Sequence, residues 1–177
     1  MEDTSRTEIS EPNPEEINRE DFMTRLTEPD RSNITRLIST FRKTMGERQQ
    51  KGGVMAVGGI IEKPPPRKDI DLRVVVETGR TREDHNSQYE LAMDKFRALQ
   101  DIASQIILED QGMRITDVDE PTIDEEFQSS AILKCEGTIK IEKDGTTPIE
   151  LLNSLASTFE EEAKRQVRPF VILAKAA

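Results

Sequence analysis

Two long stretches of the chain carry apolar residues at the spacing of one helix face. The first begins near Ser32 and stops before the pair Gly52-Gly53, and the second opens at Ser87 and stops near Gly112. Ser87 and Glu90 have the spacing of a capping box, which marks the start of a helix. The apolar positions recur every three or four residues, at Ile34, Leu37, Ile38, Phe41 and Met45, and at Tyr89, Met93, Phe96, Leu99, Ala103 and Ile106. This period predicts two amphipathic helices, each with one buried face.

Strict alternation of apolar and polar residues predicts strands elsewhere. The clearest case is 69–78, where Ile70, Leu72, Val74 and Val76 share one face and Asp69, Asp71, Arg73 and Glu77 share the other. The segment 130–142 alternates in the same way, and 54–57, 113–118 and 170–174 are shorter apolar segments typical of strands. After a turn at Asp144-Gly145, Thr147, Pro148 and Glu150 have the pattern of a helix N-terminus, so we expect a last helix that buries Leu151, Leu152, Leu155 and Phe159.

These elements predict an α+β fold, with a mixed β-sheet and helices packed on one of its faces. The first 29 residues are different, because they are acidic, poor in apolar side chains and interrupted by Pro12, Pro14 and Pro29. We therefore expect a disordered acidic tail at 1–29, with one short helix possible near 17–26, and a folded domain at 30–177.

Charge is unevenly placed along the 177 residues. The net charge is −10, but residues 31–73 carry +6, whereas 1–30 carry −7 and 74–177 carry −9. The basic middle either receives an anionic ligand or is a solvated helix face. No apolar stretch is long enough to span a membrane and the chain does not start like a signal peptide, so we expect a cytoplasmic protein without membrane contact. With one cysteine, Cys135, and one histidine, His85, an internal disulfide and Cys/His metal clusters are excluded.

The candidate chemistry lies between 57 and 73. Val57-Gly58-Gly59 is followed by nine residues and then by Asp69-Ile70-Asp71-Leu72. Two carboxylates at i and i+2 of a strand project from one face, and they repel each other unless a cation lies between them; Mg²⁺ suits such a pair. The paired glycines allow backbone N–H groups to approach a phosphate, which Lys63, Arg67 and Lys68 would help to neutralise. Arg73 shares a face with the aspartates and would pair with either the carboxylates or the phosphates.

This pattern resembles the nucleotidyltransferase superfamily typified by DNA polymerase β. The resemblance implies two Mg²⁺ ions and transfer of a nucleoside monophosphate from a nucleoside triphosphate to a hydroxyl acceptor, which could be a small molecule, an RNA end or a protein. It also implies a third carboxylate on a later strand, beside Asp69 and Asp71. Glu136 is our first choice for this third catalytic and metal-binding residue, Glu142 is the alternative, and Asp117 or Asp119 is a weaker one.

Two other functions stay open at this point. One is a nucleotidyltransferase-like domain that binds a nucleotide or a protein without catalysis. The other is an interaction module unrelated to nucleotides, in which the acidic tail contacts a partner protein. Metal-dependent nucleotide binding with turnover separates the enzyme from both, and binding without turnover separates the two alternatives.

Overall fold

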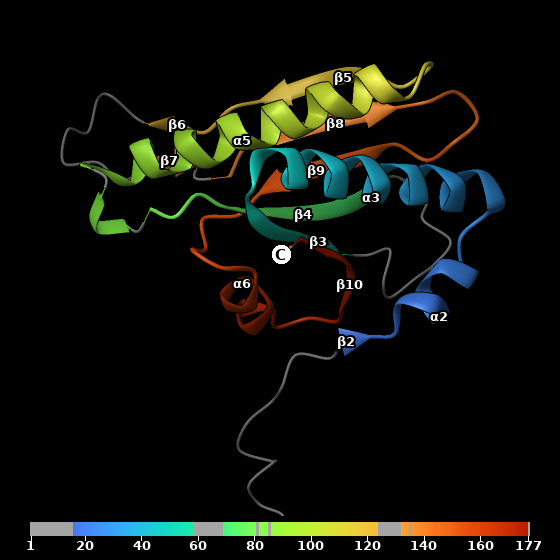
Figure 1. The fold of residues 1–177 in the computed structure, drawn as a ribbon, viewed down its shortest axis with the longest axis horizontal. Coiled ribbons are helices and arrows are strands. Elements are labelled where there is room, and N and C mark those ends of the chain that lie inside the picture. The colour runs from blue at the N-terminus through green and yellow to red at the C-terminus, as the bar shows by residue number, and fades with distance from the viewer. Residues whose placement is uncertain are drawn as a thin grey trace, which may run out of the picture.

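In the computed structural model, which describes residues 16–58, 69–80, 82–84, 86–123, 132–134 and 136–176, one seven-stranded mixed sheet organises the chain (Figure 1). Its strand order is β2-β10-β3-β4-β9-β8-β5. The strands are β2 (Glu16–Ile17), β10 (Phe170–Ala176), β3 (Lys51–Val57), β4 (Ile70–Glu77), β9 (Ile149–Asn153), β8 (Thr138–Glu142) and β5 (Arg114–Asp119). Two short strands, β6 (Thr122–Ile123) and β7 (Ile132–Lys134), pair in a separate hairpin sheet.

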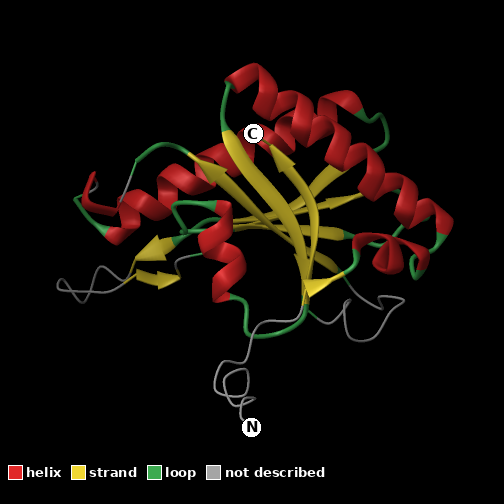
Figure 2. Ribbon diagram, turned by 60° about the horizontal axis from the view of Figure 1, so that its bottom comes forward, coloured by secondary structure: helices red, strands yellow, loops and turns green. Residues whose placement is uncertain are grey.

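Helices cover both faces of the large sheet. On one face lie α2 (Arg19–Thr24), α3 (Glu28–Arg48) and α5 (Gln88–Glu109), and on the other lies the short α6 (Phe159–Arg165) (Figure 2). A single-turn 3₁₀ helix, η1 (Arg82–Asp84), precedes α5. The mixed α+β class is thus confirmed, but the expectation that all helices pack on one face is wrong. Phe159 of α6 packs with Met55 and Val75, whose side chains point away from α3 and α5.

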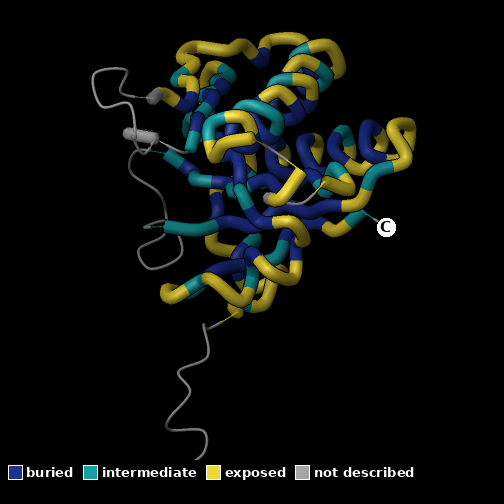
Figure 3. Tube along the Cα trace, turned by 90° about the vertical axis from the view of Figure 1, so that its left-hand side faces the viewer, coloured by how far each residue is buried: buried dark blue, intermediate teal, exposed yellow. Residues whose placement is uncertain are grey.

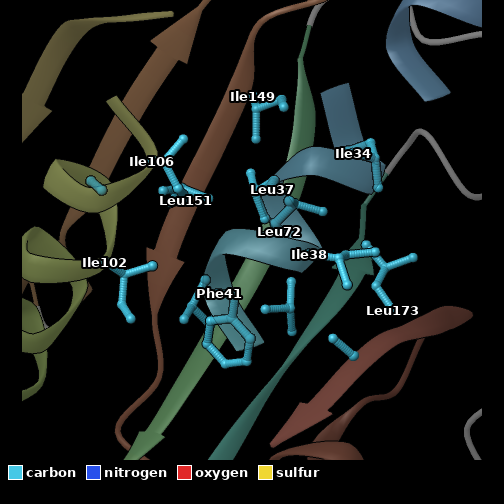
Figure 4. Close-up of a cluster of buried hydrophobic side chains, with 14 of the residues drawn as sticks. Ile34, Leu37, Ile38, Phe41, Leu72, Ile102, Ile106, Ile149, Leu151 and Leu173 are labelled. Carbon is cyan, nitrogen blue, oxygen red and sulfur yellow. The ribbon is translucent and has the colours of Figure 1, made fainter. Parts of the chain in front are cut away.

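The main core lies between the sheet and the two long helices. Ile34, Leu37, Ile38 and Phe41 of α3 meet Leu72 of β4, flanked by residues of α5, β9 and β10 (Figure 4). Helix α5 starts at the predicted cap, where the Ser87 hydroxyl accepts from Glu90 N–H, whereas α3 starts at Glu28, before the expected Ser32, with the Thr27 hydroxyl accepting from Asp30 N–H. The central strands are buried along most of their length, whereas in the long helices buried and exposed residues alternate within each turn (Figure 3).

Three expected elements differ from the structure. Residues 147–159 do not form a helix: β9 occupies 149–153, and α6 begins only at Phe159. The expected strand 130–142 is divided into β7 and β8 around Gly137, where a Cβ would lie 2.3 Å from the ring of Phe96. Gly52-Gly53 lies inside β3 rather than after the helix, and α3 ends in a left-handed cap at Gln49.

The expected tail boundary also moves. Residues 16–29 form β2, α2 and the start of α3, and the side chains of Phe22 and Leu26 are buried in the main core. The aromatic and leucine side chains supply enough apolar contact to order a segment that the proline and charge content had assigned to the tail. Residues 1–15 lie outside the described residues. Among the described residues, no helix is both long and apolar enough to cross a bilayer.

Candidate functional site

The site is built on two parallel neighbours in the middle of the sheet, β4 and β9. Their register pairs Ile70 with Ile149, Asp71 with Glu150 and Leu72 with Leu151. Opposite residues of paired strands point to the same face, so Asp71 and Glu150 project side by side while their apolar neighbours enter the core. Asp69, which directly precedes β4, projects to the same face. The result is a carboxylate cluster of Asp69, Asp71 and Glu150.

The carboxylate cluster has the dimensions of a divalent cation site. One oxygen from each of the three residues lies within 4.8 Å of the others, and all three residues are half-buried. Carboxylate oxygens are the hard ligands that Mg²⁺ prefers, and two or three of them leave coordination positions for water and phosphate oxygens. Lys140 of β8 supplies a nearby protein cation, with Nζ 3.6 Å from Asp69 Oδ2. The donor set therefore fits Mg²⁺, provided that Lys140 yields its place beside Asp69.

Asp71 is the electrostatically strained member of the cluster. Its pKa is raised from 3.8 to about 6, chiefly by burial and then by the negative charges of Glu150 and Asp69. A hydrogen bond with Glu150 acts in the same direction, whereas the positive charge of Arg73 opposes the increase. A bound cation would reverse the balance, because it favours the charged form of every carboxylate that contacts it.

Gly58 closes one side of the cluster. It follows β3 directly, and β3 pairs Val57 with Asp71. Its φ of +84° lies in the left-handed region, and a Cβ at this position would lie 2.8 Å from Asp71 Oδ2. The residue is therefore glycine for two reasons, the backbone conformation and the closeness of the carboxylate. Its backbone lies next to Asp71, where the sequence predicted a phosphate-binding loop.

A pocket of about 480 Å³ opens beside Gly58 and Asp71. Its volume is within the range of small-molecule sites. Its lining has three chemical kinds. Apolar side chains come from Val57, Leu152 and Leu155, carboxylates from Asp71, Glu136 and Glu162, and guanidinium groups from Arg73, Arg165 and Arg168. A lining that contains both apolar side chains and guanidinium groups suits a ligand that has an uncharged ring and an anionic group.

Arg73 lines this pocket and is paired with two glutamates. Its Nη1 is 2.5 Å from Glu136 Oε2, and its Nε is 3.6 Å from Glu162 Oε2. Glu162 is itself buried and accepts hydrogen bonds from the Ser154 hydroxyl and from the Gln166 amide. The Nε of Arg73 is buried and donates no hydrogen bond to any described residue. Among the described residues, this nitrogen therefore has an ion-pair neighbour, Glu162, but no hydrogen-bond acceptor.

Glu136, the expected third carboxylate, is bound to Arg73 and is not part of the carboxylate cluster. It precedes β8, and the register of β8 aligns Lys140, not Glu136, with Glu150. The alternatives, like Glu136, do not belong to the carboxylate cluster. Glu142 pairs with Arg114 at the outer edge of the sheet, and Asp117 and Asp119 lie on β5, two strands away from β9. The carboxylate that lies beside Asp71 is Glu150, which the sequence analysis did not name.

Sequence reasoning missed Glu150 because Thr147-Pro148-Ile149-Glu150 has the residues of a helix cap. The signal that identifies it is a repeated pattern. Ile149-Glu150-Leu151 has the same apolar-acidic-apolar order as Ile70-Asp71-Leu72, and the structure pairs these two triplets residue by residue. The remaining predicted phosphate contacts, Gly59, Lys63, Arg67 and Lys68, lie outside the described residues, as do His85 and Cys135.

A buried acid on the helix side holds β9 in this register. Asp30 near the start of α3 is 3% exposed, and its carboxylate accepts from Thr147 N–H at 2.7 Å and from the Thr147 hydroxyl at 2.6 Å. The next carbonyl, of Pro148, accepts from Ile70 N–H at 2.9 Å. Asp30 therefore fixes the segment that enters β9 at the point where Glu150 is aligned with Asp71.

Comparisons with protein-family models, curated proteins and solved structures found no match to this chain.

Proposed function

We propose that this protein is a Mg²⁺-dependent nucleotidyltransferase that transfers a nucleoside monophosphate from a nucleoside triphosphate to a hydroxyl acceptor. The observation that carries the proposal is the carboxylate cluster of Asp69, Asp71 and Glu150, adjoined by Gly58 and by a pocket with both apolar and guanidinium lining. Three carboxylates from two adjacent strands, next to a glycine turn, form the arrangement that the resemblance to the nucleotidyltransferase superfamily implies, with Glu150 in place of Glu136.

Each part of the site has a role in this reaction. Asp69, Asp71 and Glu150 would hold Mg²⁺, which supplies charge stabilisation for the triphosphate and acidifies the attacking hydroxyl. The backbone at Gly58 lies close enough to Asp71 to approach the same phosphates. The apolar residues Leu152 and Leu155 offer a surface for the base or the sugar. Arg73, which lines the pocket, would place a guanidinium charge beside the anionic part of the substrate.

A specific contact favours a second function, nucleotide binding without catalysis. Lys140 already compensates Asp69 at 3.6 Å, and Arg73 is paired with Glu136 and Glu162. A pocket whose charges are balanced by the protein itself can bind a nucleotide without metal. The two functions differ in one measurable way, because only the enzyme requires Mg²⁺ for tight binding and converts the bound nucleotide.

Thermal unfolding with each nucleoside triphosphate, with and without Mg²⁺, tests the proposal. A ligand at a hundred times its dissociation constant adds about 2.7 kcal/mol of stability, which raises Tm by roughly 5–10 °C for a domain of this size. We expect a Mg²⁺-dependent increase in the wild type that Glu150→Gln abolishes. Glu142→Gln, on the adjacent strand but outside the cluster, is the matched control and should retain it.

Turnover is then measured with the nucleotide that gives the largest shift, by following release of pyrophosphate with candidate acceptors. A Tm increase that is equal with and without Mg²⁺ and lacks pyrophosphate release supports the binding module instead. No increase with any nucleotide contradicts both functions. An increase that survives in Glu150→Gln but not in Glu136→Gln would restore Glu136 as the third carboxylate.

A further inference from the structure

A second concave surface lies on the helix side of the sheet, between α2 and α3. This α2–α3 groove has a volume of about 760 Å³. Met23 and Ile38 provide its apolar surface, and Arg19, Arg31 and Arg42 provide its charge, with Glu20 as the one acid among the described lining residues. It belongs to a different face of the sheet from the carboxylate cluster, so an inference about it does not depend on the proposed reaction.

The arginines of the groove are held by backbone carbonyls instead of carboxylates. Arg19 donates to the carbonyl of Leu173 at 2.9 Å, and Arg31 donates to the carbonyls of Met23 and Leu26, both at 3.0 Å. Arg42 is exposed and has no hydrogen-bond or ion-pair partner among the described residues. Within the described part of the chain, two guanidinium groups are thus fixed in place with their charge uncompensated, and a third is available beside them.

Other arginines of the same surface are compensated. Arg36 and Arg48, which also belong to α3, lie 3.1 and 2.8 Å from the carboxylates of Asp110 and Asp101. Within α3, the arginines outside the groove are paired with carboxylates, whereas those that line it are not paired with a described carboxylate. This difference indicates that the groove suits an anion from outside the described residues. Guanidinium groups that are already oriented lose little conformational freedom when they bind a carboxylate, which favours their use in recognition.

The shape of the groove narrows the chemistry of its ligand. Arg31 and Arg42 are eleven residues apart on one helix, a rise of roughly 16 Å, which is longer than a single small anion. The apolar surface of Met23 and Ile38 lies on the same side of α3, and Ile38 is 7% exposed. An extended acidic chain with an apolar side chain between its charges matches this spacing. A nucleic-acid backbone matches the charges but not the apolar surface.

We propose that the occupant of the α2–α3 groove is the segment 1–15 of this same chain. Its sequence has the required composition, with five acids and one arginine, and with Ile9 placed between Glu8 and Glu11. It is joined to the groove covalently, since Glu16 begins β2 and Arg19 lines the groove three residues later. Covalent attachment gives the segment a high effective concentration, so weak surface contacts suffice to hold it. The acidic start and the basic middle of the sequence are thereby complementary surfaces of one molecule.

Amide hydrogen exchange of the full chain, read on peptides from 1–15, tests this docking. We expect protection at low salt that decreases in about 1 M NaCl, where exposed charges are screened. Arg42→Glu should reduce the protection about two- to fivefold, the factor that one exposed ion pair contributes. Arg97→Glu reverses an exposed arginine of α5 outside the groove and is the matched control; it should leave the protection unchanged.

A charge exchange completes the test. Glu8→Lys with Glu11→Lys should remove the protection, and combining both with Arg42→Glu should restore part of it. Exchange of 1–15 at the rate of a free peptide in the wild type at low salt would overturn the proposal, as would equal effects of Arg42→Glu and Arg97→Glu. Arg42-dependent binding of an added oligouridylate, with 1–15 still unprotected, would assign the groove to an external polyanion and would also overturn it.

Discussion

On strand β4, the side chains that point toward α3 and α5 are apolar, whereas two of the side chains that point to the opposite face, Asp71 and Arg73, are charged. Ile70, Leu72 and Val74 are at most 3% exposed and belong to the main core. Asp71 and Arg73, which alternate with them, are half-buried and form the site with carboxylates from other elements. The comparison shows that one strand can carry stability on one face and chemistry on the other, so substitutions on the two faces should separate folding from binding.

The largest expected effect is on the apolar face. Leu72→Ala removes a fully buried side chain between α3 and the sheet, and it should reduce the free energy of unfolding by about 3–5 kcal/mol, the usual cost of such a cavity. Urea denaturation measures this change. A loss below about 1 kcal/mol would show that the helix-covered face does not carry the stability, and the separation of the two faces would fail.

Asp30 links the two faces, because a buried carboxylate on the core side holds the strand that presents Glu150. Asp30→Ala leaves the Thr147 N–H and hydroxyl without their acceptor, and we expect a loss of about 2–3 kcal/mol together with weaker Mn²⁺ binding at the cluster. Asp30→Asn retains one carbonyl acceptor and should restore most of both properties. If stability falls in Asp30→Ala while Mn²⁺ binding is unchanged, Asp30 supports the fold without setting the register of Glu150.

Substitution of Gly58 has two expected effects, a loss of stability from the left-handed backbone and a steric contact with Asp71, and these effects can be measured separately. Gly58→Ala carries the penalty of a left-handed backbone, about 1–2 kcal/mol, and in addition places a Cβ against the Asp71 carboxylate. Gly79→Ala is the matched control, since Gly79 has a φ of +78° and a Cβ added there would meet nothing within 4 Å among the described residues. Both variants should lose similar stability, but only Gly58→Ala should weaken Mn²⁺ binding, by about tenfold. Equal Mn²⁺ affinities in the two variants would contradict the role of Gly58.

The smallest expected effect is a pH dependence on the polar face. The pKa of Asp71 is raised to about 6 in the folded protein, so between about pH 4 and 6 the folded state binds more protons than the unfolded state. The free energy of unfolding contributed by this group therefore falls as the pH rises through that window and is constant above it.

Asp71→Asn removes this titration. Above about pH 7 it should be more stable than the wild type by about 1–2 kcal/mol, less than the full shift implies because the half-buried group is partly screened by water. The difference should vanish below about pH 4. Urea denaturation across this range measures it, with Asp117→Asn at the exposed edge strand as the control. A variant that is less stable than the wild type at neutral pH would show that the charge of Asp71 is compensated in the folded protein.

Local pattern predicted much of the fold, and long-range pairing explains what it missed. The apolar residues that recur from Ile34 and from Tyr89 predicted α3 and α5, and the alternation from Ile70 to Glu77 predicted β4. These predictions succeed because burial of one face of a helix or strand determines the spacing of its apolar residues. Strand β9 has only five residues, and the residues that lead into it also satisfy a helix cap. Its state is decided by β4 and β8, which pair with it from other parts of the chain.

The same reason limits the prediction of the site. Asp69, Asp71 and Gly58 are close in sequence or joined by one strand pair, so their proximity follows from the motif. The third carboxylate depends on strand order and register, and these placed Glu150 beside Asp71 and Glu136 beside Arg73. Alternation along a strand shows which residues share its polar face. It does not show which of those acids lies beside Asp69 and Asp71.

Direct binding of Mn²⁺, as a spectroscopic substitute for Mg²⁺, tests the central claim that Asp69, Asp71 and Glu150 form the metal site. Electron paramagnetic resonance of free Mn²⁺ gives the affinity of the full chain and of two variants that each neutralise one glutamate. Glu150→Gln should weaken binding by about tenfold or more, as expected for loss of a charged ligand. Glu136→Gln should leave the affinity within about twofold, because Glu136 is paired with Arg73. Unchanged affinity in Glu150→Gln, with a large loss in Glu136→Gln, would contradict the claim.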